Sequence, residues 1–432
     1  MPEVNVAPYG SWKSPITSDL IVSESIRLGQ LNLDGKAIYW IEQRPQEGGR
    51  NVIVRGTADG KIDDVTPPPF NARTRVHEYG GGAFCVADGV IYFANFDDQR
   101  LYRHRHGQTP VPITPAGDIR YADMVIDPVR DRLICLQEDH ASSSQEAINT
   151  VASVPLGENG SRQVLVSGSD FYSSPRLSPD GGKLAWLSWN HPNMPWDGTE
   201  LWTSDLSPDG LLEHPEKVAG GIEESIFQPE WSPDGTLYFV SDRTGWWNIY
   251  RWRNGNVEVV TALEAEFGRP QWAFGSSTYA FQSAQRIICS YVQDGSWRMA
   301  SLDTEHGVLE PVETPYTDMA RGDLRVTSDD AVMISGSAVE PLSVVRLDLS
   351  NGDTQVLRTS CDVSVDPAYL SAPEAIEYPT ENGLTARAFY YPPSNGDYAP
   401  TSGEKPPLLV KSHGGPTNAT SVSLDLSIQY WT

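Results

Sequence analysis

The sequence predicts a mostly β protein: a seven-bladed β-propeller followed by the opening strands of a second domain that mixes helices and strands. Three observations point to this fold class. A unit of one turn and one strand recurs seven times, glycine and proline are abundant (37 and 33 of 432 residues), and an apolar run near the end of the sequence stops at a glycine-rich turn. Many short strands joined by tight turns are typical of all-β repeat architectures.

The repeated unit has the pattern of a hairpin. Asp-Gly or an equivalent pair provides the positive φ of a tight turn, and Val, Ile, Tyr, Trp and Phe then alternate with small or polar residues, as in a half-buried strand. The units start 41 to 54 residues apart, which is the spacing of a four-stranded propeller blade. They are Leu33–Gln43, Val86–Phe96, Asp127–Asp139, Leu177–Trp189, Trp231–Asp242, Ala273–Ala284 and Thr327–Ala338.

Residues 21–365 are therefore predicted to form the propeller, with a large β-sandwich or a β-solenoid as the alternatives. The rhythm changes after that point. Residues 366–432 read as a strand, a turn at Asn382-Gly383, a second strand, a proline-rich loop and the run "PPLLVKSHGGPT". A short apolar run without alternation predicts a strand that is covered on both faces. Residues 1–20 are expected to pack on this second domain.

Composition and charge exclude several classes of function. The net charge of −25 and the absence of a long basic run argue against a nucleic-acid partner. No apolar stretch reaches the length of a membrane span, and the sequence starts without a basic, apolar leader, so a cytoplasmic protein is expected. Three of the four cysteines lie in strand-like runs, which predicts buried free thiols. The segment Arg103–His106 lacks the carboxylate or thiolate partners of a metal site.

The most specific motifs are the blade turns "LSPDG" from Leu177 and "WSPDG" from Trp231, and the turn "HGGP" at His413–Pro416. Together with "PYGSWKSPIT" from Pro8 and "RVHEYGGGAF" from Arg75, they resemble the prolyl oligopeptidase (S9) family of serine peptidases. Within the family the resemblance is strongest to the acylaminoacyl-peptidase and aminopeptidase-like branch. The resemblance covers essentially the whole chain. The motif "SPDG" alone is common among propellers, but its combination with "HGGP" is specific to the family.

The resemblance implies a propeller that covers an α/β-hydrolase domain and screens short peptide substrates by size. It implies no cofactor and no metal. The backbone N–H of Gly415 would help to form the oxyanion hole, where a Cβ would obstruct the approach of the main chain. His413 and Gly414 belong to the same turn, and His413 is not the catalytic base, because the family's Ser, Asp and His all follow this turn.

The sequence departs from the family at the nucleophile, because it contains no Gly-x-Ser-x-Gly motif. We therefore expect residues 366–432 to be the truncated beginning of an α/β-hydrolase domain, inactive alone and less stable than the blades. A non-catalytic TolB-like propeller and an esterase on the same frame are the alternatives. The sequence leaves exo- or endopeptidase action and homo-oligomer formation open.

Three acidic residues are candidates for binding substrate. By resemblance to dipeptidyl peptidases, in which a pair of glutamates on the propeller holds the substrate amine, Glu223 and Glu224 are one candidate pair. Glu78, beside three consecutive glycines, is expected to face the gap between the domains. The alternative for Glu223 and Glu224 is a pair of solvated loop acids, which are common in a protein of this charge, and the alternative for Glu78 is a residue that holds a blade together. Trp246 and Trp247 are expected to pack between blades.

Overall fold

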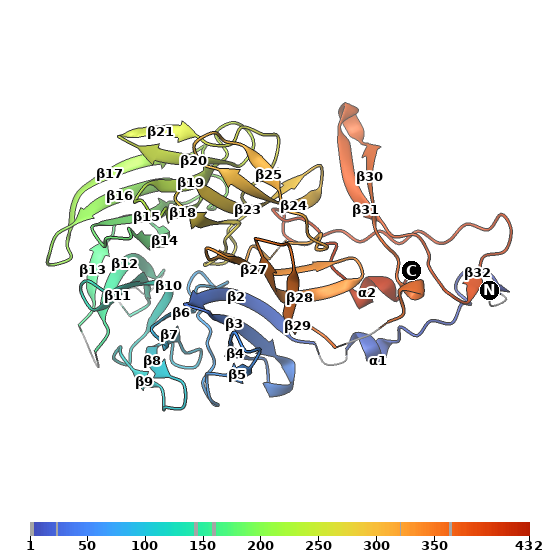
Figure 1. Ribbon diagram of the computed structural model, residues 1–432, viewed down its shortest axis with the longest axis horizontal. Coiled ribbons are helices and arrows are strands. Elements are labelled where there is room, and N and C mark those ends of the chain that lie inside the picture. Colours follow the sequence, from blue (N-terminus) through green and yellow to red (C-terminus); the bar gives the residue numbers. More distant parts are fainter. Residues whose placement is uncertain (1–3, 23–24, 142–145, 158–160, 320, 363–364) are drawn as a thin grey trace.

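The computed structural model describes residues 4–22, 25–141, 146–157, 161–319, 321–362 and 365–432. Seven four-stranded antiparallel sheets surround a common axis, and each sheet is one blade of a β-propeller (Figure 1). Each blade uses four consecutive strands, paired in chain order from the axis outward. The predicted seven-bladed propeller is thereby confirmed.

The strands of the seven blades, four to a blade in chain order, are β2 (Arg27–Asp34), β3 (Ala37–Arg44), β4 (Arg50–Gly56), β5 (Ile62–Asp64); β6 (Phe84–Ala87), β7 (Val90–Ala94), β8 (Leu101–Arg105), β9 (Val111–Pro112); β10 (Ile119–Asp127), β11 (Arg132–Asp139), β12 (Ile148–Pro155), β13 (Gln163–Val166); β14 (Phe171–Leu177), β15 (Lys183–Trp189), β16 (Glu200–Leu206), β17 (Leu212–Gly220); β18 (Ile226–Trp231), β19 (Leu237–Ser241), β20 (Asn248–Arg253), β21 (Asn256–Val259); β22 (Tyr279–Ser283), β23 (Arg286–Gln293), β24 (Ser296–Asp303), β25 (Leu309–Pro311); and β26 (Leu324–Val326), β27 (Asp330–Ser337), β28 (Glu340–Asp348), β29 (Thr354–Thr359). We number the blades 1 to 7 in this order.

Six of the seven predicted turns join the first strand of a blade to its second. The sixth unit, from Ala273, differs, because the strand that follows it is β22, the innermost strand of blade 6. Gly275 has a left-handed φ of +81°, yet it lies in the link between blades 5 and 6 rather than in a hairpin. The hairpin of blade 6 follows Ser283 instead, without an Asp-Gly pair to mark it.

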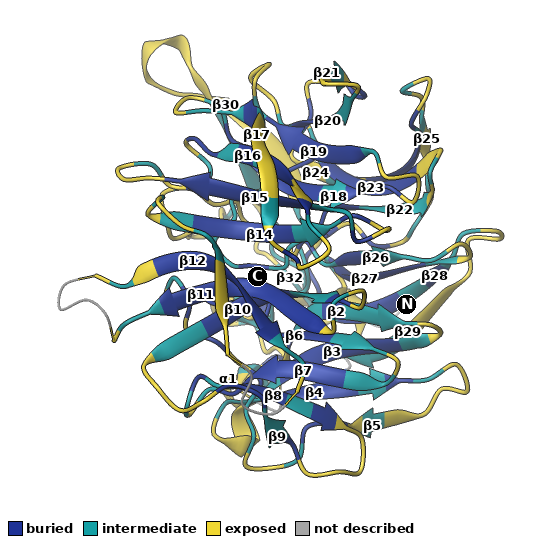
Figure 2. Cartoon of the chain, turned by 90° about the vertical axis from the view of Figure 1, so that its left-hand side faces the viewer, coloured by how far each residue is buried: buried dark blue, intermediate teal, exposed yellow. Residues whose placement is uncertain are grey.

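Apolar side chains fill each gap between neighbouring blades, and seven buried clusters correspond to the seven gaps. The middle strands of the blades are buried, whereas outer strands such as β17 face solvent (Figure 2). This gradient arises because neighbouring blades cover both faces of the middle strands, whereas the outer strands lie at the rim of the propeller. The core is therefore a ring of layers rather than a single central cluster.

The seam between blades 1 and 7 closes the ring without an exchanged strand. Leu28 and Trp40 of blade 1 pack against Val332 of blade 7 in one buried cluster. The Arg358 guanidinium on β29 also reaches the Glu42 carboxylate on β3, with 2.8 Å between Nε and Oε1. The Ile26 N–H next to β2 also donates a hydrogen bond of 2.8 Å to the Ser360 carbonyl after β29, so side-chain packing, an ion pair and a backbone hydrogen bond hold the two ends of the ring together.

The remaining segments lie outside the propeller. A hairpin of β30 (Glu374–Pro379) and β31 (Thr385–Tyr390) projects from the rest of the chain (Figure 1). Near the N-terminus, β1 (Asn5–Val6) pairs in parallel with β32 (Tyr398–Ala399), so residues 5–6 contact the segment after the propeller. Two four-residue helices, α1 (Ser18–Ile21) and α2 (Leu426–Gln429), lie in contact with each other.

The segment before the glycine turn differs from the sequence-based expectation. Leu408, Leu409 and Val410 were predicted to form a strand covered on both faces, but they are exposed and form no strand. No described strand pairs with this segment, so its backbone groups have no ladder to join. A strand exists only where a neighbouring strand takes up its hydrogen bonds, which an apolar run by itself does not specify.

Candidate functional site at one face of the propeller

The links between strands place the candidate residues on one face of the propeller. In a four-stranded up-and-down sheet, the link into the next blade and the link between the second and third strands emerge on the same side. We call this side the loop face. Its links with candidate residues are 65–83, 190–199, 221–225, 242–247, 260–278 and 312–319.

The segment around the glycine turn rests on this loop face. The indole Nε1 of Trp272 donates a hydrogen bond of 2.8 Å to the Thr417 carbonyl. A few residues later, the buried Asp318 carboxylate accepts hydrogen bonds from the backbone N–H groups of Val422 and Ser423 (3.1 and 2.9 Å). These contacts fix the turn at His413–Pro416 against the propeller.

Within this turn, Gly415 has a left-handed φ of +110°, a region that residues with a Cβ seldom adopt. Its N–H has no acceptor among the described residues. The exposed His413 ring contacts the Gly414 carbonyl, with 3.0 Å between Nδ1 and the oxygen, and meets no carboxylate in the part of the chain that the structure describes. The turn therefore presents a free backbone donor but no acid–base pair.

The link 65–83 carries a strained loop. His77 and Glu78 both have left-handed φ values, 51° and 64°, which are uncommon for residues other than glycine. The His77 ring packs edge-on against Phe171, with 5.2 Å between centroids, and its backbone N–H donates to Glu138. Burial lowers the pKa of the His77 imidazole, while the Glu138 carboxylate opposes this shift. His77 thus anchors the loop instead of facing solvent.

Glu78 is held on the surface by this anchored loop. Its side chain is 80% exposed, and Oε1 lies 3.1 Å from Nη1 of Arg120, which also pairs with Glu138. The left-handed backbone at His77 and at Glu78 itself fixes the direction in which the carboxylate leaves the main chain. Glu78 is therefore a positioned and accessible anionic group on the loop face.

The two adjacent glutamates of the next candidate site have different environments. Glu224 is committed to a structural pair, because Oε1 accepts from Nη2 of Arg243 at 2.7 Å and from the Ser241 hydroxyl at 2.6 Å. Glu223 is exposed and has no ion-pair partner within the described residues. The structure does not bring Glu223 and Glu224 together as a pair with free carboxylates.

Three aromatic rings on the loop face were not identified from the sequence. Trp272 packs against Tyr79 and Trp196, with centroid separations of 5.1 and 4.3 Å. These residues come from three different links, so no local pattern connects them. Only the unusual number of tryptophans, 13, could have suggested such a cluster. Of Trp246 and Trp247, which were both expected to pack between blades, only Trp247 packs on the cluster between blades 5 and 6. Trp246 is exposed.

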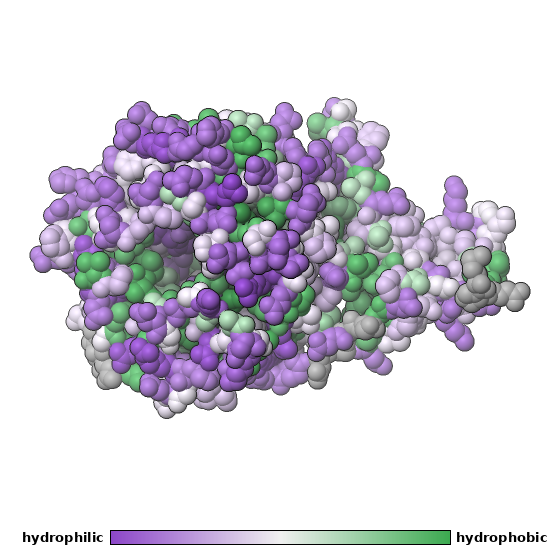
Figure 3. Space-filling model, in the orientation of Figure 1, coloured by the Kyte–Doolittle hydropathy of each residue, from purple (hydrophilic) through white to green (hydrophobic). Residues whose placement is uncertain are grey.

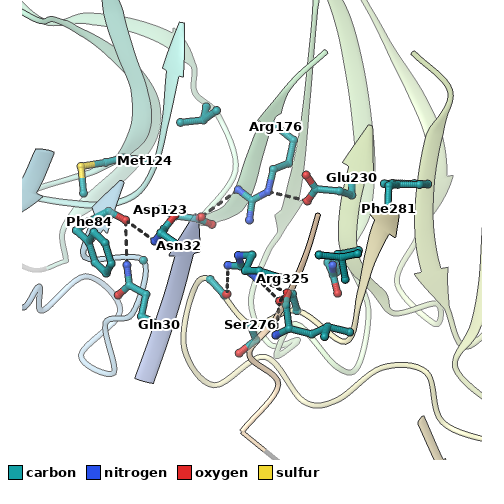
Figure 4. A pocket seen from close by; sticks show the side chains of 18 residues that line it. Gln30, Asn32, Phe84, Asp123, Met124, Arg176, Glu230, Ser276, Phe281 and Arg325 are labelled. Carbon is teal, nitrogen blue, oxygen red and sulfur yellow. Dashed lines mark hydrogen bonds and ion pairs between the residues drawn. The ribbon is translucent and has the colours of Figure 1, made fainter. Parts of the chain in front are cut away.

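A cavity of about 360 Å³ occupies the central channel, where the innermost strands of the blades meet (Figure 4). Figure 3 shows the hollow between the blades from outside. Arg176 lies in the wall between Asp123 and Glu230, at 3.0 and 3.4 Å from their oxygens. Arg325 bonds to the carbonyl of Leu324, and burial lowers the pKa of its guanidinium. Charged and polar groups therefore line this passage.

Among the residues that the structure describes, no three His, Cys, Asp or Glu side chains come close enough to hold a metal ion. No described helix is long and apolar enough to cross a membrane.

Comparisons with known proteins place this geometry in a family. No protein-family model matches the chain, and no curated protein does. Among solved structures, a puromycin-hydrolysing peptidase from Mycobacterium tuberculosis is 35% identical, with a TM-score of 0.92, over 99% of this chain and 67% of that one. A puromycin hydrolase mutant in complex with PGG is 34% identical, with a TM-score of 0.91, over 99% of this chain and 68% of its own.

More distant structures share the fold alone. One from a study of two prolyl endopeptidases is 13% identical, with a TM-score of 0.62, and covers 85% of this chain and 54% of its own. The propeller, the loop face and the turn at His413–Pro416 thus occur together in a chain whose similar structures include peptidases at 35% identity over 99% of its length. The chain belongs to the prolyl oligopeptidase (S9) family of serine peptidases.

Proposed function

We propose that the protein functions in the hydrolysis of short peptides and aminoacyl amides that carry a free amine. In this proposal the loop face holds the substrate over the turn at His413–Pro416. The observation that carries the proposal is the docking of this turn on the propeller through Trp272 and Asp318, with the N–H of Gly415 left without an acceptor among the described residues.

Gly415 is proposed to stabilise the transition state of acyl transfer. A negative charge develops on the carbonyl oxygen when a nucleophile attacks it, and a fixed N–H donor lowers the energy of that charge. In serine peptidases, one such donor lowers the activation barrier by about 3 kcal/mol. Pro416 has no N–H and cannot supply the donor, so Gly415 is the candidate within this turn.

Glu78 and Glu223 are proposed to bind the substrate's ammonium group. Both are exposed on the loop face, and a carboxylate binds an ammonium through a charge-assisted hydrogen bond. Glu224 is a poorer candidate because its side chain is only 21% exposed and is held by Arg243 at 2.7 Å, whereas Glu78 is 80% exposed and shares Arg120 with Glu138. The net charge of −25 further favours a cationic substrate over an anionic one.

The similar structures suggest one substrate class. Two structures at 35% identity are those of a puromycin-hydrolysing peptidase and of a puromycin hydrolase. We therefore propose puromycin, alongside the short peptides and aminoacyl amides named above, as a ligand of the loop face.

The 432 residues contain no Gly-x-Ser-x-Gly motif, so the nucleophile is not among the groups that we assign. We expect no turnover of peptide p-nitroanilides by these residues alone. Turnover that survives repurification and is blocked by a serine-directed phosphonate would contradict this expectation.

Binding tests the proposal independently of turnover. In calorimetric titration of the 432-residue protein, we expect L-alanyl-L-alaninamide to bind at least tenfold more tightly than its N-acetylated form. Glu78→Gln should remove most of this difference, whereas Glu216→Gln, an exposed acid on the outer strand β17, should leave it unchanged. Equal affinity for the two peptides would overturn the assignment of amine recognition.

A further inference from the structure

We propose that Tyr79, Trp196 and Trp272 form a subsite that binds an aromatic side chain of the substrate residue bearing the free amine. We call these three residues the aromatic subsite. The inference rests on the proposed function, because it assigns the side chain of the same substrate whose amine the loop-face carboxylates bind.

The geometry is that of an open aromatic surface. Trp272 lies in the middle, with its ring inclined at 69° to Tyr79 and at 44° to Trp196. Tyr79 is 65% exposed, and two apolar residues of the loop face are exposed as well, Met194 in the link of Trp196 and Ile222 in the link 221–225. Rings that only fill a core are buried on all sides, whereas a partly exposed cluster of rings leaves room for another ring.

The subsite is attached to the proposed oxyanion turn. The hydrogen bond from Nε1 of Trp272 to the Thr417 carbonyl joins the central ring to a residue two positions after Gly415. The same bond fixes the plane of the indole. A residue whose side chain stacks on this ring is therefore bound beside the turn.

The supporting links are rigid, which lowers the cost of ordering the site on binding. Tyr79 follows the left-handed pair His77-Glu78 and precedes Gly80, where an added Cβ would lie 2.4 Å from the Thr74 carbonyl oxygen. The link that carries Trp196 is pressed against the link 221–225. At Gly198 an added Cβ would lie 2.4 Å from the Ile222 carbonyl oxygen.

The neighbouring charges select the ligand. Glu78 directly precedes Tyr79, and Glu223 directly follows Ile222, so carboxylates stand beside the apolar surface on two links. The nearby cation Arg120 is engaged by Glu78 and Glu138. An aromatic amino-acid amide with a protonated α-amine satisfies both the rings and the carboxylates, whereas an acidic or N-acylated residue satisfies one of them at most.

The test measures two preferences in one set of titrations with the 432-residue protein. The probes are L-phenylalaninamide, L-alaninamide and N-acetyl-L-phenylalaninamide. We expect L-phenylalaninamide to bind about tenfold more tightly than L-alaninamide, as burial of one phenyl ring predicts. Tyr79→Ala and Trp196→Leu should each reduce this ratio to below about threefold, whereas Tyr79→Phe retains the ring and should preserve it.

Trp246→Leu is the matched control, because Trp246 is an exposed tryptophan on the same face and outside the subsite. It should leave the ratio unchanged. An unchanged ratio in both Tyr79→Ala and Trp196→Leu, or equal binding of the phenylalanine and alanine amides by the wild type, would overturn the subsite. Loss of the preference for the free amine with the ring preference intact would instead count against the proposed function and leave the subsite standing.

Discussion

At the scale of single residues, the channel wall is held by side chains that bond to the next blade. Gln30, Asp123 and Gln228 occupy β-bulges with left-handed φ values of 54°, 48° and 47°. Gln228 accepts from the N–H of Thr278 and donates to the carbonyl of Tyr279, both at 2.7 Å. Each bulge turns a polar side chain along the ring, so neighbouring blades are joined by hydrogen bonds at the axis as well as by apolar packing between their faces.

Arg176 is the most consequential charge in this wall. Arg176→Met would leave the Asp123 carboxylate, which is 4% exposed, without its cationic partner. Loss of one partner of a buried pair costs about 3 kcal/mol or more, and access of channel water to Arg176 reduces this to about 2 kcal/mol. We expect a clearly lower thermal midpoint than in Lys183→Met, which removes the surface pair with Asp205. Equal midpoints for the two variants would show that the channel pair contributes no stability.

His77 should make stability depend on pH. Its folded-state pKa lies below the ordinary value of 6.5, so the unfolded chain takes up the proton first as the pH falls. The stabilisation is complete above about pH 6.5 and is lost as the pH falls towards the folded-state pKa. His77→Asn, which tolerates the left-handed backbone, should unfold at a midpoint that changes less between pH 7.5 and 5 than the wild-type midpoint. Parallel pH profiles would contradict this assignment.

At the scale of elements, the run Gly80–Gly82 holds the loop of Glu78 against blade 3 and against the link between blades 5 and 6. A Cβ at Gly81 would lie 2.4 Å from the Phe274 carbonyl oxygen. Gly81→Ala should therefore cost about 3 kcal/mol and weaken amine binding together with stability. Gly89→Ala is the matched control, because Gly89 has a similar left-handed φ but open space around its Cα, and it should cost about 1 kcal/mol. Similar losses in both variants would mean that the backbone angle, and not the contact, sets the cost.

The blades could be predicted from the sequence because their signals are local. An Asp-Gly turn followed by alternating apolar residues specifies a hairpin within about a dozen residues, as at Asp34-Gly35 and Asp234-Gly235. The sixth unit was misplaced because Gly275 provides a left-handed φ of +81° in the link between blades 5 and 6, and from the sequence a glycine in such a link looks the same as a glycine in a hairpin turn. The strand predicted at Leu408–Val410 was wrong because the apolar pattern of this run carries no information about a partner strand.

The candidate site was predictable only in part. The turn at His413–Pro416 could be identified because its residues are contiguous in the sequence and form a motif that resembles one in a known family. The different environments of Glu223 and Glu224 depend on Arg243, which lies 19 residues away from Glu224 on another link. The aromatic subsite forms only because the links that carry Tyr79, Trp196 and Trp272 emerge on the same face of the propeller. This proximity depends on the tertiary structure and cannot be inferred from a single sequence.

At the scale of the whole molecule, the seam between blades 1 and 7 should be the weakest point of the ring, since the chain does not run directly from one of these blades to the other as it does between successive blades. Arg358→Met removes the ion pair to Glu42, which keeps its bonds to Arg44 and Trp40, so we expect a loss of about 1 kcal/mol. Arg346→Met is the control, because its side chain has the same 37% exposure but pairs with Asp330 within blade 7. Hydrogen exchange should rise in β3 and β29 for the first variant only, and a rise in both would argue against a special role for the seam.

The contiguity of each blade has a consequence for synthesis. A sheet whose four strands follow one another along the chain can complete its ladder as soon as its own segment has left the ribosome, because it waits for no distant strand. The propeller can then fold blade by blade from blade 1, and each new blade covers the apolar face that the preceding blade left exposed. The face of blade 1 that carries Leu28 and Trp40 stays uncovered longest, until Val332 and Val344 have been translated, so it is the surface of the nascent chain most in need of a chaperone.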